Sequence, residues 1–366
     1  MAITQEPEAN GLYFQKNIPD IIIQKEAGDI DMRTLELLID GISVISEKYV
    51  FDTTGEIRIR NIGDIVEKYF TDSKLILPVS FSLTDEVNPA YTIPFQALKC
   101  ESDMIVEASS WTATNFLTRA YREKRTSKSN NEYLSFLHRS TYGFCLLRYR
   151  IVYLLNGIIT ELTGFVNSEL IGIAAADKIT TFNASAVTIL TYAGLAPETE
   201  VIQYDLWITG LDFEMNKYTF LVDYSVYRNK KYFVFINSFG VLETFTGTGQ
   251  TDTKKTPEYS LGNIKNHYRK LTQDFVAEKT AYSGFLSDVE MEWIDDLLIS
   301  YDVALYTPGV TGAAEEITFT TVEKTDTEAN VLQAFSFSYR RADNNNLQFT
   351  NAAKGVFDNT FDETFN

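Results

Sequence analysis

The chain has 366 residues, of which 45% are hydrophobic and 22% charged, and this balance excludes a wholly disordered protein. The formal net charge is -18, so the bulk surface should repel nucleic-acid phosphates and anionic lipids. We therefore expect no nucleic-acid partner at the bulk surface, and no membrane span, because no run of about 18 apolar residues occurs.

Strand-like runs dominate the first part of the chain. Asp40-Gly41 separates two apolar runs, and this pair favours a β-hairpin because a type I′ turn needs positive φ at both central residues. Asn61 is placed to cap a short amphipathic helix over residues 62–70. Further strands are expected at 56–60, 75–83 and 91–98.

A cluster of basic residues follows in the middle of the chain. It lies between 119 and 128 and comprises Arg119, Arg122, Lys124, Arg125 and Lys128. We interpret it as an exposed loop, either simply solvated or in contact with an acidic partner such as residues 358–363. Beyond it, Asn156-Gly157 predicts a second hairpin between strands 142–155 and 158–165.

The second half repeats this style. A strand is expected at 201–209, a hairpin is expected from 218–227 and 231–236, and a further strand is expected at 241–245. Residues 247–252 are predicted to be flexible. Ser287-Asp-Val-Glu290 is a capping box that opens a helix. The side chains expected to face inward from this helix are Val289, Trp293, Ile294, Leu297 and Leu298. Paired strands at 317–322 and 332–339 should complete the fold.

These elements predict a mainly β protein of antiparallel sandwich or barrel domains with a few short helices, because turns rather than helices join the strands. A chain of this length can bury two cores. We expect an N-terminal arm over 1–20, one β domain over 21–195 and another over 196–350. Residues 351–366 are expected to form a docking tail.

The tail has a repeated aromatic pattern. Phe357, Phe361 and Phe365 are spaced four residues apart among acidic residues, so they share one face of an extended chain. Three exposed Phe side chains are unfavourable unless they dock in a groove, on this chain or on a neighbour. They are the predicted partner-docking residues.

Catalytic residue types are scarce. The chain has 2 His and 2 Cys, none close to another in sequence. His138 and His267 lack partners at a metal-ligand spacing, so both are expected to be structural. Cys100 and Cys145 are expected to be buried free thiols, while a disulfide between them stays open. No cofactor, metal or catalytic residue is predicted.

Two weaker patterns point to chemistry. Gly247-Thr-Gly-Gln-Thr251 lacks the residue order of a phosphate-binding loop, so a flexible loop is the better interpretation. Four carboxylates could include a glycosidase pair, although acids in the first turns of a helix are favourable there in any case. These carboxylates are Glu290, Glu292, Asp295 and Asp296.

Several runs of the sequence resemble virion structural proteins of bacteriophages and prophages from gut-dwelling anaerobes. They lie at 231–245, 284–300 and 335–343, with the ending at 355–366 and the N-terminal run at 17–23. The resemblance implies a tail or baseplate component located in the virion and made in the host bacterial cytoplasm. It supplies no catalytic residues. A secretory signal is not expected either, because the first six residues have no basic leader and no apolar stretch.

Three functions follow as hypotheses. The first is a non-enzymatic subunit of a tail- or baseplate-type assembly, a symmetric multimer that binds itself and other virion proteins through extended termini. The second is a carbohydrate- or receptor-binding β-sandwich that uses Trp111, Trp207 or Trp293 as a stacking platform. Trp293 should pack in its helix interface, which leaves Trp111 as the better platform. The third is a glycoside hydrolase acting through a carboxylate pair.

Overall fold

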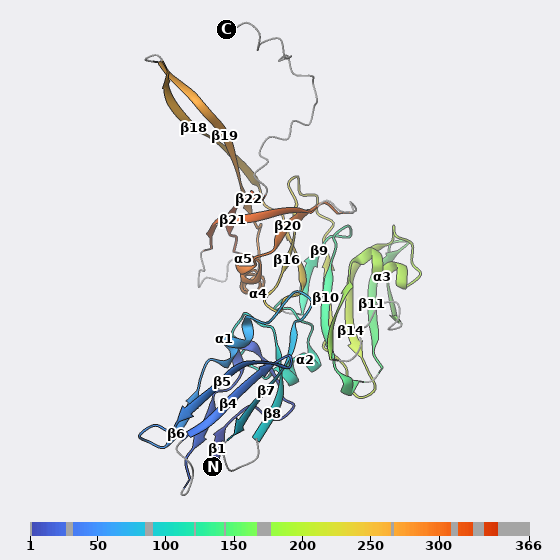
Figure 1. The fold of residues 1–366 in the computed structure, drawn as a ribbon. Helices are drawn as coiled ribbons and strands as arrows, with labels where there is room; N and C mark the ends of the chain where they lie inside the picture. Colours follow the sequence, from blue (N-terminus) through green and yellow to red (C-terminus); the bar gives the residue numbers. More distant parts are fainter. Residues whose placement is uncertain are drawn as a thin grey trace, which may run out of the picture.

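The computed structural model of the protein describes residues 2–26, 32–84, 91–120, 122–142, 144–166, 177–264, 267–308, 314–324 and 333–342. Within these ranges the chain is mainly β with a few short helices, as the sequence predicts. Its strands form five open sheets. The pairing is antiparallel except between β15 and β9 and between β2 and β8. Figure 1 shows the N-terminal sheets at one end of the molecule and a long hairpin projecting from the other.

Residues 2–98 form the first unit. A three-stranded and a five-stranded sheet share one core that includes Ile23, Ile57, Leu37 and Phe81, so this unit is a β-sandwich. The sheets run, in order, β1 (Ala2–Gln5), β3 (Ile21–Gln24), β6 (Glu56–Ile59), and β2 (Leu12–Phe14), β8 (Tyr91–Leu98), β7 (Ile76–Thr84), β4 (Met32–Ile39), β5 (Ile42–Val50). The short helices η1 (Gln15–Asn17) and α1 (Ile62–Glu67) lie against each other.

Local turn chemistry in this unit is partly as predicted. Asp40 and Gly41 have φ of 53° and 78° and join β4 to β5, which confirms the hairpin. Asn61 precedes α1 as predicted, but it adopts a left-handed conformation with φ of 58° and makes no side-chain cap. The expected N-terminal arm is paired within the chain, since β1 lies beside β3 and β2 beside β8.

The middle of the chain forms two further sheets. The larger has the order β12 (Ile158–Val166), β11 (Leu146–Leu155), β14 (Glu200–Thr209), β15 (Tyr218–Val222), β9 (Glu123–Thr126). The smaller pairs β10 (Tyr133–His138) with β13 (Lys178–Asn183). The short helices here are α2 (Ala108–Thr114), η2 (Ser140–Tyr142) and α3 (Ala186–Tyr192). Positive φ at Asn156 and Gly157 confirms the second predicted hairpin, β11–β12.

The last sheet has seven strands. Its order is β17 (Leu242–Gly247), β16 (Lys231–Ile236), β20 (Val303–Tyr306), β21 (Glu315–Glu323), β22 (Ser336–Arg341), β19 (His267–Tyr282), β18 (Thr251–Ile264). Helices α4 (Asp288–Trp293) and α5 (Asp295–Ile299) follow β19. The predicted capping box is present, because Ser287 accepts from the Glu290 backbone and Glu290 accepts from the Ser287 backbone. Val289 is exposed, contrary to prediction, and Met291 is buried in its place.

One continuous core runs through the middle and last sheets. It extends from Phe116 to Tyr339 and includes residues on both sides of position 195, where a domain boundary was expected. The five-stranded middle sheet also crosses this position, since β11 precedes it and β14 follows it. The main change of core in the described chain therefore falls near residue 100.

Two sequence expectations for the second half are wrong. β15 and β16 do not form a hairpin, because β15 pairs with β14 and β9 while β16 pairs with β17 and β20. Residues 247–252 were expected to be flexible, but this stretch ends inside a strand, because β18 begins at Thr251. The β18–β19 hairpin was not predicted from the sequence, although it projects far from the rest of the molecule in Figure 1.

Candidate functional site

The expected exposed loop at 119–128 is wrong at its centre. Residues Glu123–Thr126 form β9, whose side chains alternate between solvent and interior, and Lys124 is buried. The Lys124 ammonium donates to Glu132 at 2.7 Å and to the backbone oxygen of Thr244 at 2.6 Å. Lys124 therefore contributes to the interior and is not available to an external acidic partner.

Glu132 is the acceptor at the centre of this network. Its carboxylate accepts from Lys124, from Thr126 and Thr244, and from the Asn130 amide, with distances of 2.6 to 2.7 Å. A fully buried carboxylate is costly unless it is paired and hydrogen-bonded, and Glu132 has one cation and three neutral donors. The network ties β9 to the loop before β10 and to β17.

Trp293 of α4 links this network to a second buried acid. Lys124 Nζ lies 5.1 Å from the centroid of the Trp293 ring, and the indole N–H donates to Glu243 at 2.9 Å. Glu243 also accepts from Thr118 at 2.6 Å and from Asn237 at 2.8 Å. Burial raises the pKa of Glu243 to about 7, although nearby Lys124 opposes the shift.

A third buried acid, Asp296, lies in the first turn of α5. It accepts from Arg119 at 3.0 Å and from the Ser238 hydroxyl at 3.1 Å. Burial raises its pKa, and the charge of Arg119 opposes that rise. Asp295 next to it pairs with Lys324 at 2.7 Å, and Glu290 is held in the capping box. Of the four candidate glycosidase acids, three are thus engaged in contacts within the chain.

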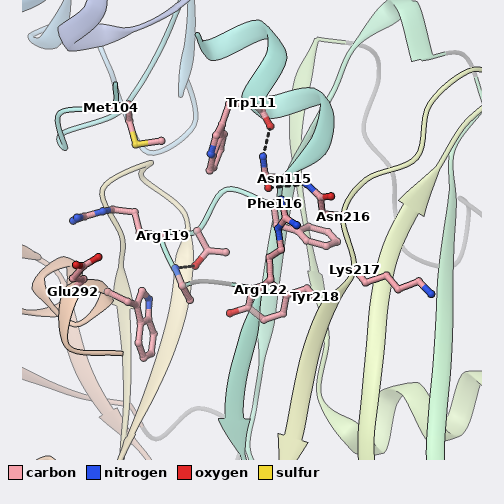
Figure 2. A pocket seen from close by; sticks show the side chains of 13 residues that line it. Met104, Trp111, Asn115, Phe116, Arg119, Arg122, Asn216, Lys217, Tyr218 and Glu292 are labelled. Atoms are coloured by element: carbon pink, nitrogen blue, oxygen red, sulfur yellow. Dashed lines mark hydrogen bonds between the residues drawn. The ribbon is translucent and has the colours of Figure 1, made fainter. Parts of the chain in front are cut away.

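Two hollows lie on either side of Trp293. The first is a cleft of about 380 Å³ between α2, the segment after it and α4, shown in Figure 2. Trp111, Asn115, Arg119, Arg122 and Glu292 line it. Asn216 donates to Asn115 at 3.2 Å and Asn115 donates to the Trp111 backbone oxygen at 3.0 Å.

The second hollow is a groove of about 410 Å³ between β9, β17 and the segment after β19. Its floor is formed by buried apolar side chains, namely Phe245, Leu286 and Trp293. Phe285 lies at its rim and is 67% exposed. We call this hollow the aromatic groove. It adjoins the buried network through Lys124 and Trp293.

The structure separates the five basic residues of the predicted cluster. Arg119 and Arg122 line the cleft of Figure 2, and Arg125 lines the aromatic groove. Lys128 lines a neighbouring hollow, and Lys124 is buried between the two sides. The predicted docking residues Phe357, Phe361 and Phe365 lie outside the described residues.

The three tryptophans differ in how far they are available as a stacking platform. Trp207 and Trp293 are buried, which for Trp293 confirms the prediction. Trp111 is half-buried, and one face of its ring stacks on Phe239 with centroids 5.1 Å apart. Only its remaining surface, in the cleft of Figure 2, is open to a ligand.

The remaining candidate residues have structural surroundings. Cys100 and Cys145 are buried and unpaired, as expected. Burial raises the pKa of the Cys100 thiol to about 12 and that of Cys145 to about 11. His138 ends β10 and His267 begins β19. In the part of the chain that the structure describes, no three His, Cys, Asp or Glu side chains gather where they could hold a metal ion.

The two acids at the centre of the site, Glu132 and Glu243, were not predicted from the sequence. Glu132 lies in a polar stretch and Glu243 in an aromatic strand. For Glu243 a signal existed, because it alternates with the apolar residues Val241 and Phe245 along the predicted strand and therefore shares their inward face. For Glu132 no pattern in the sequence indicated burial.

No protein-family model matches the chain, and no curated protein matches it. Among the described residues, none of the helices has both the length and the apolar character needed to cross a membrane.

Proposed function

We propose that the chain is a non-enzymatic structural subunit of a phage tail- or baseplate-type assembly, and that the β18–β19 hairpin connects neighbouring copies. The sequence runs that resemble virion proteins support the type of assembly. The hairpin is the single observation that carries the role of a connecting subunit.

The hairpin is too long to be supported by its own body. β18 and β19 contain 14 and 16 residues, and only Lys279–Tyr282 of β19 pair with β22. Beyond Lys279, strand pairing in the described part of the hairpin is between β18 and β19 alone. At ~3.4 Å per residue, the part from Lys254 to Ile264 extends roughly 35 Å. An isolated two-stranded ribbon is only marginally stable in water, so a neighbour that covers it would stabilise it.

The outer part of the hairpin has the chemistry of a contact surface. Leu261 and Tyr268 are 55% and 77% exposed. Residues 259–273 contain three cations, Lys265, Arg269 and Lys270, and no carboxylate, whereas the whole chain has a net charge of -18. A second copy therefore offers the acidic surface that this segment would complement.

The buried network supports the non-enzymatic part of the proposal. Glu132, Glu243 and Asp296 each accept several hydrogen bonds from side chains of this chain. Fixed donors hold these carboxylates in place and connect three parts of the core. Such an arrangement favours rigidity over proton transfer to a substrate.

Shortening the hairpin tests the proposal. Lys255 and Ala277 face each other across the ladder, so residues 256–276 can be replaced by Asn-Gly as a tight turn. We expect the shortened chain to remain folded, with Tm within about 2 °C of the parent, because the described strands of the removed segment pair with each other and not with the body. Mass photometry should then show monomers where the parent forms multimers.

A milder variant keeps the hairpin at full length and tests the contribution of its exposed side chains alone. Leu261→Ala with Tyr268→Ala removes two exposed side chains and should weaken self-association at least tenfold. The matched control is Leu211→Ala with Tyr301→Ala, two side chains that are 84% and 90% exposed on the body. Equal multimers from the parent and the shortened chain would contradict the proposal.

Carbohydrate binding is the second candidate, and the cleft of Figure 2 favours it. Trp111 lies there beside two side-chain amides and Arg119, and an aromatic ring with nearby amides is a common way to hold a sugar. Glycan-array binding by the purified chain that is lost in Trp111→Leu would support this function over the first.

A further inference from the structure

The aromatic groove extends beyond its apolar floor. A neighbouring hollow of about 580 Å³ shares Ser127, Asp223, Tyr227 and Lys230 with it, so the two form one elongated depression. The volume of the floor region, about 410 Å³, lies within the roughly 300–1,000 Å³ typical of ligand pockets. An extended peptide with aromatic anchors fits such a shape better than a compact small molecule does.

Aromatic and aliphatic side chains are exposed around this depression. Phe285 is 67% exposed in the lining of the aromatic groove, and Tyr224 and Val226 are 47% and 95% exposed in the lining of the second hollow. Buried aromatic anchors with a partly exposed apolar rim are the usual composition of a peptide-docking site.

The charges at the rim favour an acidic peptide. Arg125, Lys128 and Lys230 line the depression. Within the described residues no ion pair involves Arg125 or Lys128. Two carboxylates, Asp223 and Glu290, also line the depression, so its rim carries three cations against two anions.

One segment of this chain has the matching composition. Residues 357–366 contain Phe357, Phe361 and Phe365, with three carboxylates and no cation. Residues four apart in an extended peptide project on the same face, so these rings could enter the groove while the acids meet the basic rim.

The direction of β22 favours a tail from another copy. Its first residue, Ser336, pairs with Tyr282, which immediately precedes the groove residue Ser283. Its last residue, Arg341, pairs with Ile317. The strand therefore carries the chain away from its own groove, by roughly 17 Å over five residues, so a tail that binds its own groove would have to turn back over that distance.

We propose that the aromatic groove binds the Phe-bearing C-terminal tail of a second copy of this chain. Phe side chains of the tail fill the apolar floor, and its carboxylates pair with Arg125, Lys128 and Lys230. This inference rests on the proposed self-assembly and names a second contact, distinct from the hairpin.

Site-directed cross-linking of full-length chains tests it. One chain carries Phe285→Cys at the groove rim and a second, ¹⁵N-labelled chain carries Phe361→Cys in the tail. Both are mixed at equal concentrations and oxidised, and linked peptides are identified by mass spectrometry. The native thiols do not interfere because both are buried. The control pairs the Phe361→Cys chain with Leu211→Cys, a position that is 84% exposed and is not among the residues that line the depression.

A labelled–unlabelled disulfide between the rim and tail cysteines, at least tenfold above the control, supports the proposal. Arg125→Glu with Lys230→Glu should reduce that yield at least fivefold, and Asp358→Lys with Asp362→Lys in the tail should restore it. In a second mixture, of labelled and unlabelled chains that each carry both cysteines, cross-links confined to one chain would show docking in cis and overturn the proposal. A self-associating protein that gives no rim–tail cross-link would also overturn it and would leave the hairpin proposal intact, whereas a monomeric parent chain would overturn both.

Discussion

The indole N–H of Trp293 donates a 2.9 Å hydrogen bond to the buried carboxylate of Glu243. Lys124 lies 5.1 Å from the centroid of the same ring, so one side chain of α4 connects the two buried acid networks. Because α4, β9 and β17 meet at this tryptophan, the energetics of the surrounding acids determine how firmly these three elements hold together.

Glu243 should make stability depend on pH near neutrality. Its folded-state pKa of about 7 lies above the ordinary value of 4.5, so the folded protein binds the proton more tightly than the unfolded chain does. Stability from this group is therefore greatest below about pH 4.5 and falls as pH rises to about 7, by an amount on the order of 3 kcal/mol.

Urea denaturation between pH 5 and 8.5 measures this slope. Glu243→Gln should flatten it, at a cost of about 1–3 kcal/mol at low pH because the amide cannot accept from all three present donors. A wild-type curve that rises toward pH 8, or an unchanged slope in the Gln variant, would contradict the assignment.

Lys124 and Glu132 should be strongly coupled. Lys124→Met leaves a buried carboxylate without its cation and should cost about 3–5 kcal/mol of unfolding free energy. Adding Glu132→Gln removes the stranded charge, so the double variant should be more stable than Lys124→Met alone. Lys128→Met is the matched control, since this half-buried cation of the same segment should change stability by about 0.5 kcal/mol or less. Additive effects in the double-mutant cycle would count against the network.

Substitutions in the β11–β12 turn should change the stability of the protein through backbone conformation alone. Gly157 has φ of 78°, and no atom lies within 4 Å of a Cβ added there. Gly157→Ala should therefore destabilise by about 1 kcal/mol through left-handed strain without any clash. Asn156, with φ of 53°, provides the opposite test, because Asn156→Gly should be neutral or slightly stabilising. Thermal denaturation of both variants checks the contrast in sign.

The two thiols should be unreactive in the folded protein. Cys100 and Cys145 are buried and burial raises both pKa values, so few thiolates are present at pH 8. We expect labelling by a thiol–disulfide reagent to be at least a hundredfold slower than in guanidinium, where two thiols should react at once. Prompt labelling of either cysteine in the native protein would show that its surroundings open readily.

The sequence predicted those parts of the fold that depend on neighbouring residues. The turns at Asp40-Gly41 and Asn156-Gly157 and the capping box at Ser287 are specified within four residues, so they could be recognised without the rest of the chain. The β18–β19 hairpin could not, because its strands are rich in Thr and Lys, lack an alternating apolar pattern, and have no Asn-Gly or Asp-Gly turn.

The site depends on contacts between residues far apart in sequence. The sequence Glu123-Lys-Arg-Thr126 alone predicts a solvated segment. In the structure its inward-facing side chains, Lys124 and Thr126, donate hydrogen bonds to Glu132, and Lys124 also donates to Thr244. Polar residues can face inward only when such partners exist, and a sequence pattern of alternating burial does not reveal them. The burial of Lys124 could therefore not be predicted from the sequence, because its partner Thr244 lies far away in the chain.

Phe14 has a consequence for how the protein is made. It is fully buried and packs edge-on against Trp111 and at a tilt against Phe239, which follow it by 97 and 225 residues. At translation rates of about 5–20 residues per second, its last aromatic neighbour is synthesised about 11 to 45 s after it. During that interval a nascent chain displays an apolar ring at its leading end, so chaperone demand should peak early in synthesis and end once residue 239 has emerged.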